Sequence, residues 1–265
     1  MILQKNKTMN RSFKIFICLL LCSINVLAQN KRFITEGVIE FERSTNIYAI
    51  FGKRANKSQN VWMTKIFDEI KKTGVQFKRS KSELYFNKSK TLFKPGEDTT
   101  PPIQFIGDEP SVSQINTVYM DLANHVQVSQ KKVYDEQFLV KDSTRTINWK
   151  ITDETREIAG YSCRRANALV LDSIYVVAFY TDEIPVSGGP ESFNGLPGMI
   201  LGVALPHENV TWFAKTVTDK SVANTVVVPP VKGKTVDRKG LIDTLTSVFK
   251  GWGTQINEIM KVYLL

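Results

Sequence analysis

The chain has 265 residues, of which 42% are hydrophobic and 23% are charged, and its formal net charge at pH 7 is +9. This length and composition are sufficient for one large β-rich domain or two small ones, and they exclude disorder as the default. The positive charge forms no basic stripe with interleaved aromatic residues, so nucleic-acid binding has little support.

The N-terminal segment has the pattern of an export signal. Arg11 and Lys14 stand at the start of an apolar run that covers residues 13–28 and closes on Ala28. Such a run with a small terminal residue is typical of a cleaved signal peptide. We predict cleavage after Ala28, with translation starting at either of two methionines. A membrane anchor is the weaker alternative, because the run is interrupted by polar residues and a spanning helix needs ~20 apolar ones.

Cleavage at this point changes both the charge and the cysteine count. The removed segment, residues 1–28, holds four basic residues and no acidic residue, so the formal net charge falls from +9 to +5. A lipoprotein signal would require a small residue before the acylated cysteine, whereas Cys22 follows Leu21. We therefore expect a soluble secreted or periplasmic protein that has no membrane span and retains one cysteine, Cys163, with no internal disulfide.

The first elements after the signal are a strand and a helix. Alternating apolar residues predict a strand over residues 33–42. Helical spacing of apolar residues then predicts an amphipathic helix over 58–73, with Ser58 as its N-cap and Gly74 ending it. We expect the apolar face of this helix to lie on a sheet.

A series of short strands follows. Residues 82–86 and 91–94 flank a polar four-residue turn and predict a hairpin, and residues 95–114 predict a surface loop. Further strand-like runs cover residues 117–122, 125–133, 137–140 and 148–151. Their close spacing indicates an antiparallel meander.

The second half of the chain continues this pattern. Residues 173–181 are apolar on both faces, as in a strand in the middle of a covered sheet. Asp237 is placed to cap a helix that runs to residue 250. The remaining predicted strands cover residues 199–205, 210–217 and 223–228.

These elements predict an α+β fold in a single domain over residues 29–265. Its centre is a curved antiparallel β-sheet meander with one or two packed helices. By fold-level analogy alone, a sheet of this kind is similar to that of periplasmic lipoprotein carriers.

A loop rich in glycine and proline, residues 187–200, lies between two apolar runs. It is a shaped loop and not a linker, because it carries apolar side chains that need burial. Its last part resembles the signature of the GLPGLI family, with Met199 in place of the usual Leu. The matching residues are Gly195, Leu196, Pro197, Gly198, Met199 and Ile200.

A second segment, about forty residues before that loop, also resembles this family. It consists of Trp149, a Thr-rich strand, and then Gly160, Tyr161, Cys163 and Ala166. The resemblance extends over roughly residues 33–250 and implies a secreted or envelope protein of Bacteroidota. The family has no established biochemical activity. Its genes often lie near those of TonB-dependent receptors, which implies an accessory role in outer-membrane uptake.

Two interpretations of the signature loop stay open. In one, the loop is a structural corner that packs Leu196 and Met199 into the sheet. In the other, Phe193, Asn194 and Leu196 form the rim of a site for a ligand or partner, with a tight turn at Asn194. The two interpretations are compatible with each other.

The same loop allows a prediction about substitutions. We expect Glu191 and Ser192 to tolerate change. We expect Gly195, Pro197 and Gly198 to resist it, because a tight path needs positive φ at glycine and a fixed φ at proline.

The sequence is poor in catalytic patterns. It has two histidines and neither a zinc-protease motif nor a phosphate-binding loop, and we predict no metal site and no cofactor. Cys163 lies in a strand-like run and is expected to be buried and inert. The leading hypothesis is therefore a non-catalytic envelope protein that binds an unknown ligand or an envelope protein partner. The alternatives are a hydrolase or metalloenzyme using Cys163, His125 or His207, and a purely structural envelope protein.

Overall fold

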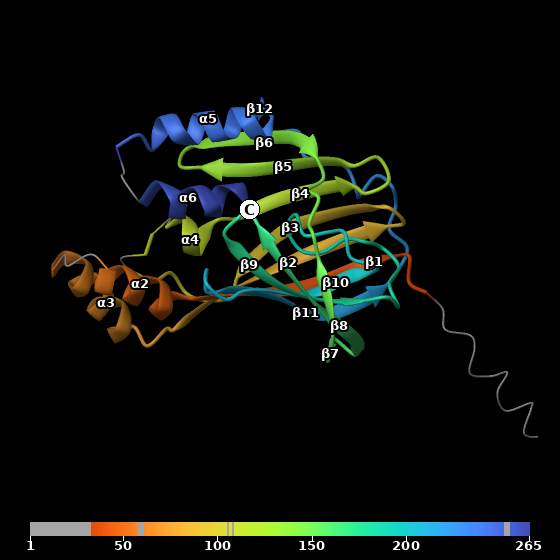
Figure 1. The fold of residues 1–265 in the computed structure, drawn as a ribbon, viewed down its shortest axis with the longest axis horizontal. Coiled ribbons are helices and arrows are strands. Elements are labelled where there is room, and N and C mark those ends of the chain that lie inside the picture. Colours follow the sequence, from red (N-terminus) through yellow and green to blue (C-terminus); the bar gives the residue numbers. More distant parts are fainter. Residues whose placement is uncertain (1–32, 58–60, 105, 108, 252–254) are drawn as a thin grey trace, which may run out of the picture. The chain divides into compact units, whose positions relative to one another are not determined.

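The structure is a computed structural model that describes residues 33–57, 61–104, 106–107, 109–251 and 255–265 (Figure 1). Its main feature is one large sheet. The strands are β1 (Glu36–Asn46), β2 (Phe77–Asn87), β3 (Lys90–Asp98), β4 (Asn116–Asp121), β5 (Val126–Val133), β6 (Glu136–Ser143), β7 (Lys150–Ile158), β8 (Tyr161–Val170), β9 (Ile174–Thr181), β10 (Met199–Leu205), β11 (Val210–Asp219) and β12 (Lys234–Val236). The helices are α2 (Ile47–Lys57), α3 (Val61–Lys72), α4 (Pro110–Ser113), α5 (Arg238–Val248) and α6 (Gln255–Leu264).

The sheet confirms the expected α+β class. Within the described residues its order is β12-β6-β5-β4-β3-β2-β1-β11-β10-β9-β8-β7. Neighbouring strands pair antiparallel except β12, which pairs parallel with β6 and makes the sheet mixed. The pairing of β1 with β11 joins the two halves of the chain, so residues distant in sequence become cross-strand neighbours.

One face of the sheet, here called the inner face, carries the main core. Alternation along β2 shows how the sequence produces it, because Ser80, Ser82, Leu84 and Phe86 are buried and lie on one side of the strand. The inner face also buries Ile39, Phe41, Val176, Val203 and the loop residues Phe193, Leu196 and Met199.

The opposite, outer face has a smaller apolar cluster. It contains Val38, Leu92 and Val128, covered by Val222 and Val227 from the segment after β11. That segment was expected to contain a strand over residues 223–228, which is wrong. Val222 and Val227 pack onto the sheet from an irregular segment that contains a turn, and burying these side chains requires no strand pairing.

Helices α5 and α6 cover the β5–β6 end of the inner face (Figure 1). Phe138 and Val140 of β6 pack there against Leu241 and Leu245 of α5. The predicted cap is confirmed, because the Asp237 carboxylate accepts a hydrogen bond of 2.7 Å from the main-chain N–H of Gly240. Helix α6 was not anticipated from the sequence.

The helix predicted over residues 58–73 is present as α3, but its packing differs from the prediction. Its N-cap candidate, Ser58, lies outside the described residues. The helix packs on α2, which the sequence did not indicate, and the ring centroids of Tyr48 and Phe67 lie 6.3 Å apart at their contact. The two helices bury their apolar faces against each other, so α3 does not need the sheet. Trp62 remains exposed.

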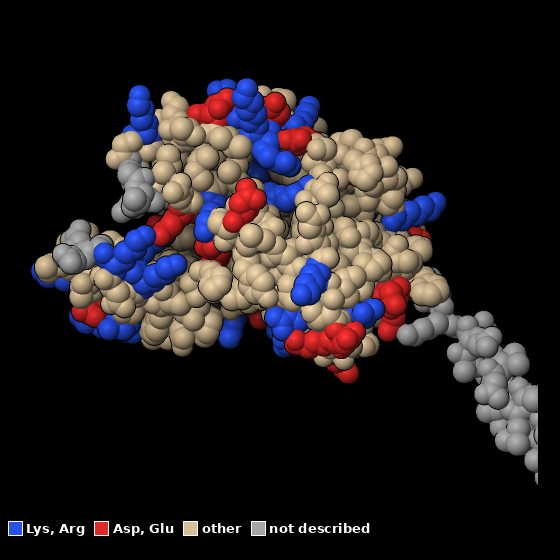
Figure 2. Space-filling model, viewed as in Figure 1, with Lys and Arg blue, Asp and Glu red and all other residues tan. Residues whose placement is uncertain are grey.

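Two strand boundaries also differ from the predictions. Strand β3 continues through Pro95 and Gly96 to Asp98, where a loop was expected, and a register shift in its pairing with β2 accommodates the proline. His125, expected within a strand, lies in the turn before β5 with φ of 55°. On the face drawn in Figure 2, acidic and basic side chains are interspersed.

Candidate functional site

A cavity of about 60 Å³ lies at the end of the inner face where β1 and β11 meet α4, α6 and the loop before β10. A single water molecule needs roughly 10–15 Å³ measured in this way, so the cavity is large enough for several waters or a small organic molecule. A second cavity of about 10 Å³ shares part of its lining. The residues common to both are Arg43, Gln114, Asn116, Glu191 and Trp212.

Arg43 contributes a buried positive charge to this cavity. Its guanidinium donates from Nη1 to the Val112 carbonyl oxygen at 2.8 Å and from Nη2 to that of Ser111 at 3.5 Å. Its Nε is buried and has no hydrogen-bond partner. Burial lowers the pKa of Arg43, and the nearby charge of Glu191 opposes this shift. The guanidinium is therefore held in place by main-chain carbonyls through Nη1 and Nη2, while Nε has no partner.

Trp212 is the cross-strand neighbour of Arg43 in the β1–β11 pair. Its side chain is 5% exposed, and its indole Nε1 is buried without a hydrogen-bond partner. The Arg43 guanidinium carbon lies 5.6 Å from the Trp212 ring centroid, which is within the range of a cation–π contact. Phe193 also packs against the indole, with ring centroids 6.4 Å apart. The indole thus packs against both Arg43 and Phe193 and keeps an unused donor.

Glu191 supplies the negative charge of the site from the loop before β10. It is 7% exposed, and its carboxylate accepts a hydrogen bond of 3.0 Å from Asn116 Nδ2. Burial raises the pKa of Glu191, whereas the Asn116 hydrogen bond and the charges of Lys131 and Arg43 lower it. The expectation that Glu191 tolerates change is therefore at odds with its burial.

Ser192 is also buried, contrary to its predicted tolerance. Its Oγ donates to the Leu265 main-chain oxygen at 2.8 Å. In the structure Glu191 and Ser192 face the cavity and α6, where polar groups have partners.

Two further basic groups lie at this end of the inner face, Lys131 near Glu191 and Arg145 near Lys131. Lys131 of β5 is 5% exposed, and burial lowers its pKa to about 8, with Glu191 opposing the shift. Arg145 donates to the Leu264 carbonyl oxygen at 2.6 Å, and burial lowers its pKa to about 10. This end of the inner face is therefore a buried charged region, unlike the apolar core beside it.

The structure separates the three residues that were proposed as a rim. Phe193 lines the cavity and is 2% exposed. Asn194 lies behind it, donating to the Ser192 carbonyl oxygen and accepting at its own carbonyl from Trp149 Nε1 at 2.9 Å. Leu196 is buried in the main core. Of the three, only Phe193 is among the residues that line the described cavity.

The signature residues form the turn into β10. Gly198 has φ of 149°, and a Cβ at this position would lie 2.1 Å from the Thr181 carbonyl oxygen. Gly195 has φ of 94°. Pro197 is exposed between them, and Met199 and Ile200 are fully buried at the start of β10.

The other family-matching residues lie in and beside β8. Gly160, with φ of 82°, forms the β7–β8 turn, and Tyr161, Cys163 and Ala166 follow in the strand. Cys163 is fully buried, and burial raises the pKa of its thiol to about 12. Its predicted burial is confirmed.

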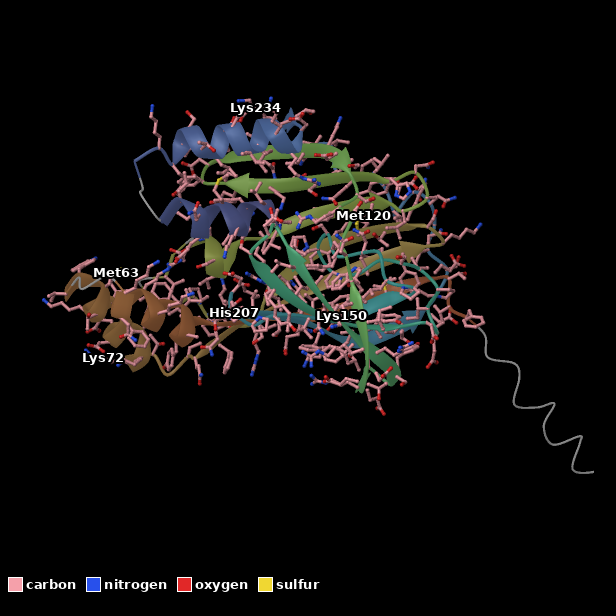
Figure 3. All side chains as sticks on the ribbon, viewed as in Figure 1. Met63, Lys72, Met120, Lys150, His207 and Lys234 are labelled. Carbon is pink, nitrogen blue, oxygen red and sulfur yellow. The ribbon has the colours of Figure 1, made fainter. Side chains whose placement is uncertain are left out.

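The three candidate catalytic side chains make contacts that are separate from one another. The Cys163 thiol donates to the Tyr161 carbonyl oxygen. His125 Nδ1 lies 3.5 Å from Thr144 Oγ1, and the His207 ring contacts Tyr175. Figure 3 labels His207, which lies in the β10–β11 turn. Within the described ranges, no three His, Cys, Asp or Glu side chains are grouped so as to hold a metal ion.

Residues 169–202 match a family model described as "Protein of unknown function (Porph_ging)". This match includes β9 and the whole signature loop, together with Glu191 and Phe193. No curated protein sequence is detectably similar to the chain. In the part of the chain that the structure describes, no helix is long and apolar enough to cross a membrane.

The solved structures that match the chain are distant from it. Two structures of PNGF-II, in space groups P21 and C2, match with TM-scores of 0.47 and sequence identities of 16% and 15%. They cover 79% and 78% of this chain, which in turn spans 32% of the PNGF-II chain. An uncharacterized conserved protein from Thermus thermophilus matches with a TM-score of 0.37 and 7% identity, covering 82% of this chain and 99% of its own.

Sequence reasoning missed Arg43, Trp212 and Lys131 as site residues. The available signal was alternation, because Arg43 falls in line with the buried positions Ile39 and Phe41 of β1. The predicted strand ended at residue 42, one residue before Arg43, so this signal was missed.

Proposed function

We propose that the chain is a non-catalytic binding protein of the bacterial cell envelope, and that the cavity between Arg43, Glu191 and Trp212 is its ligand site. We further propose that it is exported as a soluble secreted or periplasmic protein and acts beside TonB-dependent uptake machinery. The signal-like N-terminus and the resemblance to the GLPGLI family support this location.

The observation that carries the binding role is the pair of unused N–H groups at the cavity. A buried donor without a partner costs about 1–3 kcal/mol, and native proteins keep few of them. Arg43 Nε and Trp212 Nε1 are two such donors on adjacent strands beside one cavity. Both nitrogens are covered as the side chains stand, so a ligand that supplies acceptor atoms removes both penalties once small side-chain rotations turn these N–H groups toward the cavity.

The alternative of a hydrolase or metalloenzyme gains no support from the contacts of Cys163, His125 and His207. A catalytic thiol needs a lowered pKa and an adjacent base. The pKa of Cys163 is raised instead, and the hydrogen bond of its thiol goes to a main-chain carbonyl.

Native mass spectrometry of the protein purified from its own periplasm tests the binding role. We expect a small molecule to be retained by the wild-type chain and lost from Val262→Phe, which fills the cavity from α6. Val248→Phe on the exposed side of α5 is the matched control and should retain the ligand. Absence of any retained mass, or equal retention in Val262→Phe, would count against the cavity as the site.

A further inference from the structure

We propose that the cavity binds a small zwitterion, an α-amino acid, with its carboxylate at Arg43 and Trp212 and its ammonium group at Glu191. This inference rests on the proposed function and names the ligand class for that same site. Its basis is the arrangement of opposite charges around one space.

The two buried charges at the cavity do not neutralise each other directly. Arg43 is held by the main-chain oxygens of Val112 and Ser111, and Glu191 is held by Asn116. Among the described residues, Arg43 and Glu191 form no ion pair with each other, although each lines the cavity. Lys131 partly compensates Glu191, because its charge lowers the pKa of that carboxylate, but Lys131 does not line the cavity. Because a buried charge is costly unless it is paired, each end of the space still favours a ligand group of opposite charge.

The basic end fits a carboxylate. Arg43 Nε and Trp212 Nε1 are both covered donors of residues that line the cavity, and a carboxylate offers two acceptor oxygens to which small side-chain rotations would turn them. A hydrogen bond from a guanidinium to a carboxylate is charge-assisted and stronger than a neutral one. A neutral ligand would satisfy the donors but would leave the Arg43 charge unpaired.

The acidic end fits an ammonium group. The Glu191 carboxylate accepts one hydrogen bond from a protein side chain, that of Asn116, and has further acceptor capacity. A ligand with only a negative charge would be repelled by Glu191, and one with only a positive charge would be repelled by Arg43. A zwitterion avoids both repulsions.

The remaining lining limits the ligand's side chain. Phe193, Val210 and Val262 are apolar, whereas the charged Lys261 and Glu208 lie 3.4 Å apart as a pair of their own. A space of about 60 Å³ accommodates a small molecule only. We therefore expect small aliphatic amino acids to bind better than aromatic or charged ones.

Titration calorimetry on the mature full chain at pH 7 tests the charge requirement. The probes are L-valine, 3-methylbutanoate, which lacks the ammonium group, and L-valinamide, which lacks the carboxylate. We expect L-valine to bind at least ~10-fold more tightly than either analogue, since each loses hydrogen bonds to a charged group. L-phenylalanine should bind more weakly than L-valine.

Two substitutions separate the two ends of the site. Trp212→Phe keeps a ring but removes the donor, so affinity for L-valine and 3-methylbutanoate should fall ~10-fold, the loss expected for one hydrogen bond to a charged group, while L-valinamide, whose neutral amide oxygen accepts a weaker hydrogen bond, should lose less. Glu191→Gln should weaken L-valine and L-valinamide but not 3-methylbutanoate. Trp62→Phe on α3 and Glu83→Gln on β2, both at exposed positions, are the matched controls and should change none of the three. Thermal melts confirm that each variant is folded.

The outcomes distinguish this inference from the proposed function. If 3-methylbutanoate binds as tightly as L-valine and Glu191→Gln has no effect, the ligand is a plain carboxylate and the zwitterion is wrong. If no probe binds but native mass spectrometry still shows a mass that Val262→Phe loses, the ligand class is wrong and the binding role stands. If no probe binds and no mass is retained, both proposals fail.

Discussion

The two ends of the inner face of the sheet bury different kinds of side chain. At the β8–β10 end the inward positions are apolar, as with Val176, Ala178 and Val203, and the thiol of Cys163 is fully buried there. At the α4–α6 end the same face buries Arg43 and Glu191 around a cavity. The signature loop contributes residues to both ends. The apolar end stabilises the fold, and the charged end costs stability, which a binding role explains.

Leu196→Ala should produce the largest effect, at the apolar end of this comparison. Leu196 is 1% exposed in the main core, so truncation is expected to lower the free energy of unfolding by about 3 kcal/mol. Urea denaturation measures this. Leu169→Ala on the exposed side of β8 is the control and should cost less than ~0.5 kcal/mol. If Leu196→Ala and Leu169→Ala lower the free energy of unfolding equally, the loop does not anchor the core through Leu196.

Lys131→Met, at the charged end, should have the next largest effect, and it should stabilise the protein at pH 7. The folded-state pKa of Lys131 is lowered to about 8 from 10.5, so charged Lys131 opposes folding, on the order of 3 kcal/mol at neutral pH. As pH rises from 8 to 10.5, the folded chain has already released this proton while the unfolded chain still holds it. Stability of the wild type therefore rises across this window, and its deficit relative to Lys131→Met closes.

Urea denaturation at pH 7, 8.5 and 10 measures the difference in free energy of unfolding between Lys131→Met and the wild type. Lys132→Met is the control, because Lys132 is the next residue of β5 and is exposed on the opposite face. Other groups that titrate between pH 7 and 10 affect the wild type, Lys131→Met and Lys132→Met alike. If the free energies of unfolding of the wild type and Lys131→Met differ by the same amount at all three pH values, charged Lys131 is not buried in the folded state.

Gly198→Ala should have a smaller effect, in the loop that serves both ends. The added Cβ would meet the Thr181 carbonyl oxygen, and φ of 149° is unfavourable for alanine, so we expect a loss of about 2 kcal/mol. Gly160→Ala is a matched control, because Gly160 also has positive φ but has open space around it. It should cost about 1 kcal/mol. If Gly198→Ala and Gly160→Ala lower the free energy of unfolding equally, glycine is required at position 198 because of its positive φ and not because of the close Thr181 carbonyl oxygen.

Local patterns account for the parts of the fold that were predicted correctly. The hairpin turn at Lys88, the Asp237 cap and the doubly buried β9 each depend on a few adjacent residues, so their signals are visible in the sequence. Helix α2 was missed because it is stabilised by its packing on α3 and not by a strong pattern of its own. Residues 223–228 have the composition of a strand but no strand to pair with in the described structure.

The candidate site was beyond sequence reasoning for a different reason. Arg43 and Trp212 become neighbours only through the pairing of β1 with β11, and Lys131 approaches Glu191 only through the packing of the folded sheet. No periodicity in the chain encodes these pairings. The loop was identified from its glycines and prolines, but the importance of Glu191 depends on which side of the loop faces inward.

Cys163 should give the smallest effect, and it decides whether the apolar end is inert. The thiol is fully buried and its pKa is raised to about 12, so almost no reactive thiolate exists at neutral pH in the folded chain. We expect a thiol reagent to label the native protein only as fast as it unfolds, and to label it at once in denaturant. Cys163→Ala should leave amino-acid binding unchanged, because Cys163 does not line the described cavity. Rapid labelling of the folded protein would mean that this end of the sheet opens to solvent, and the distinction between a purely structural end and a binding end would no longer hold.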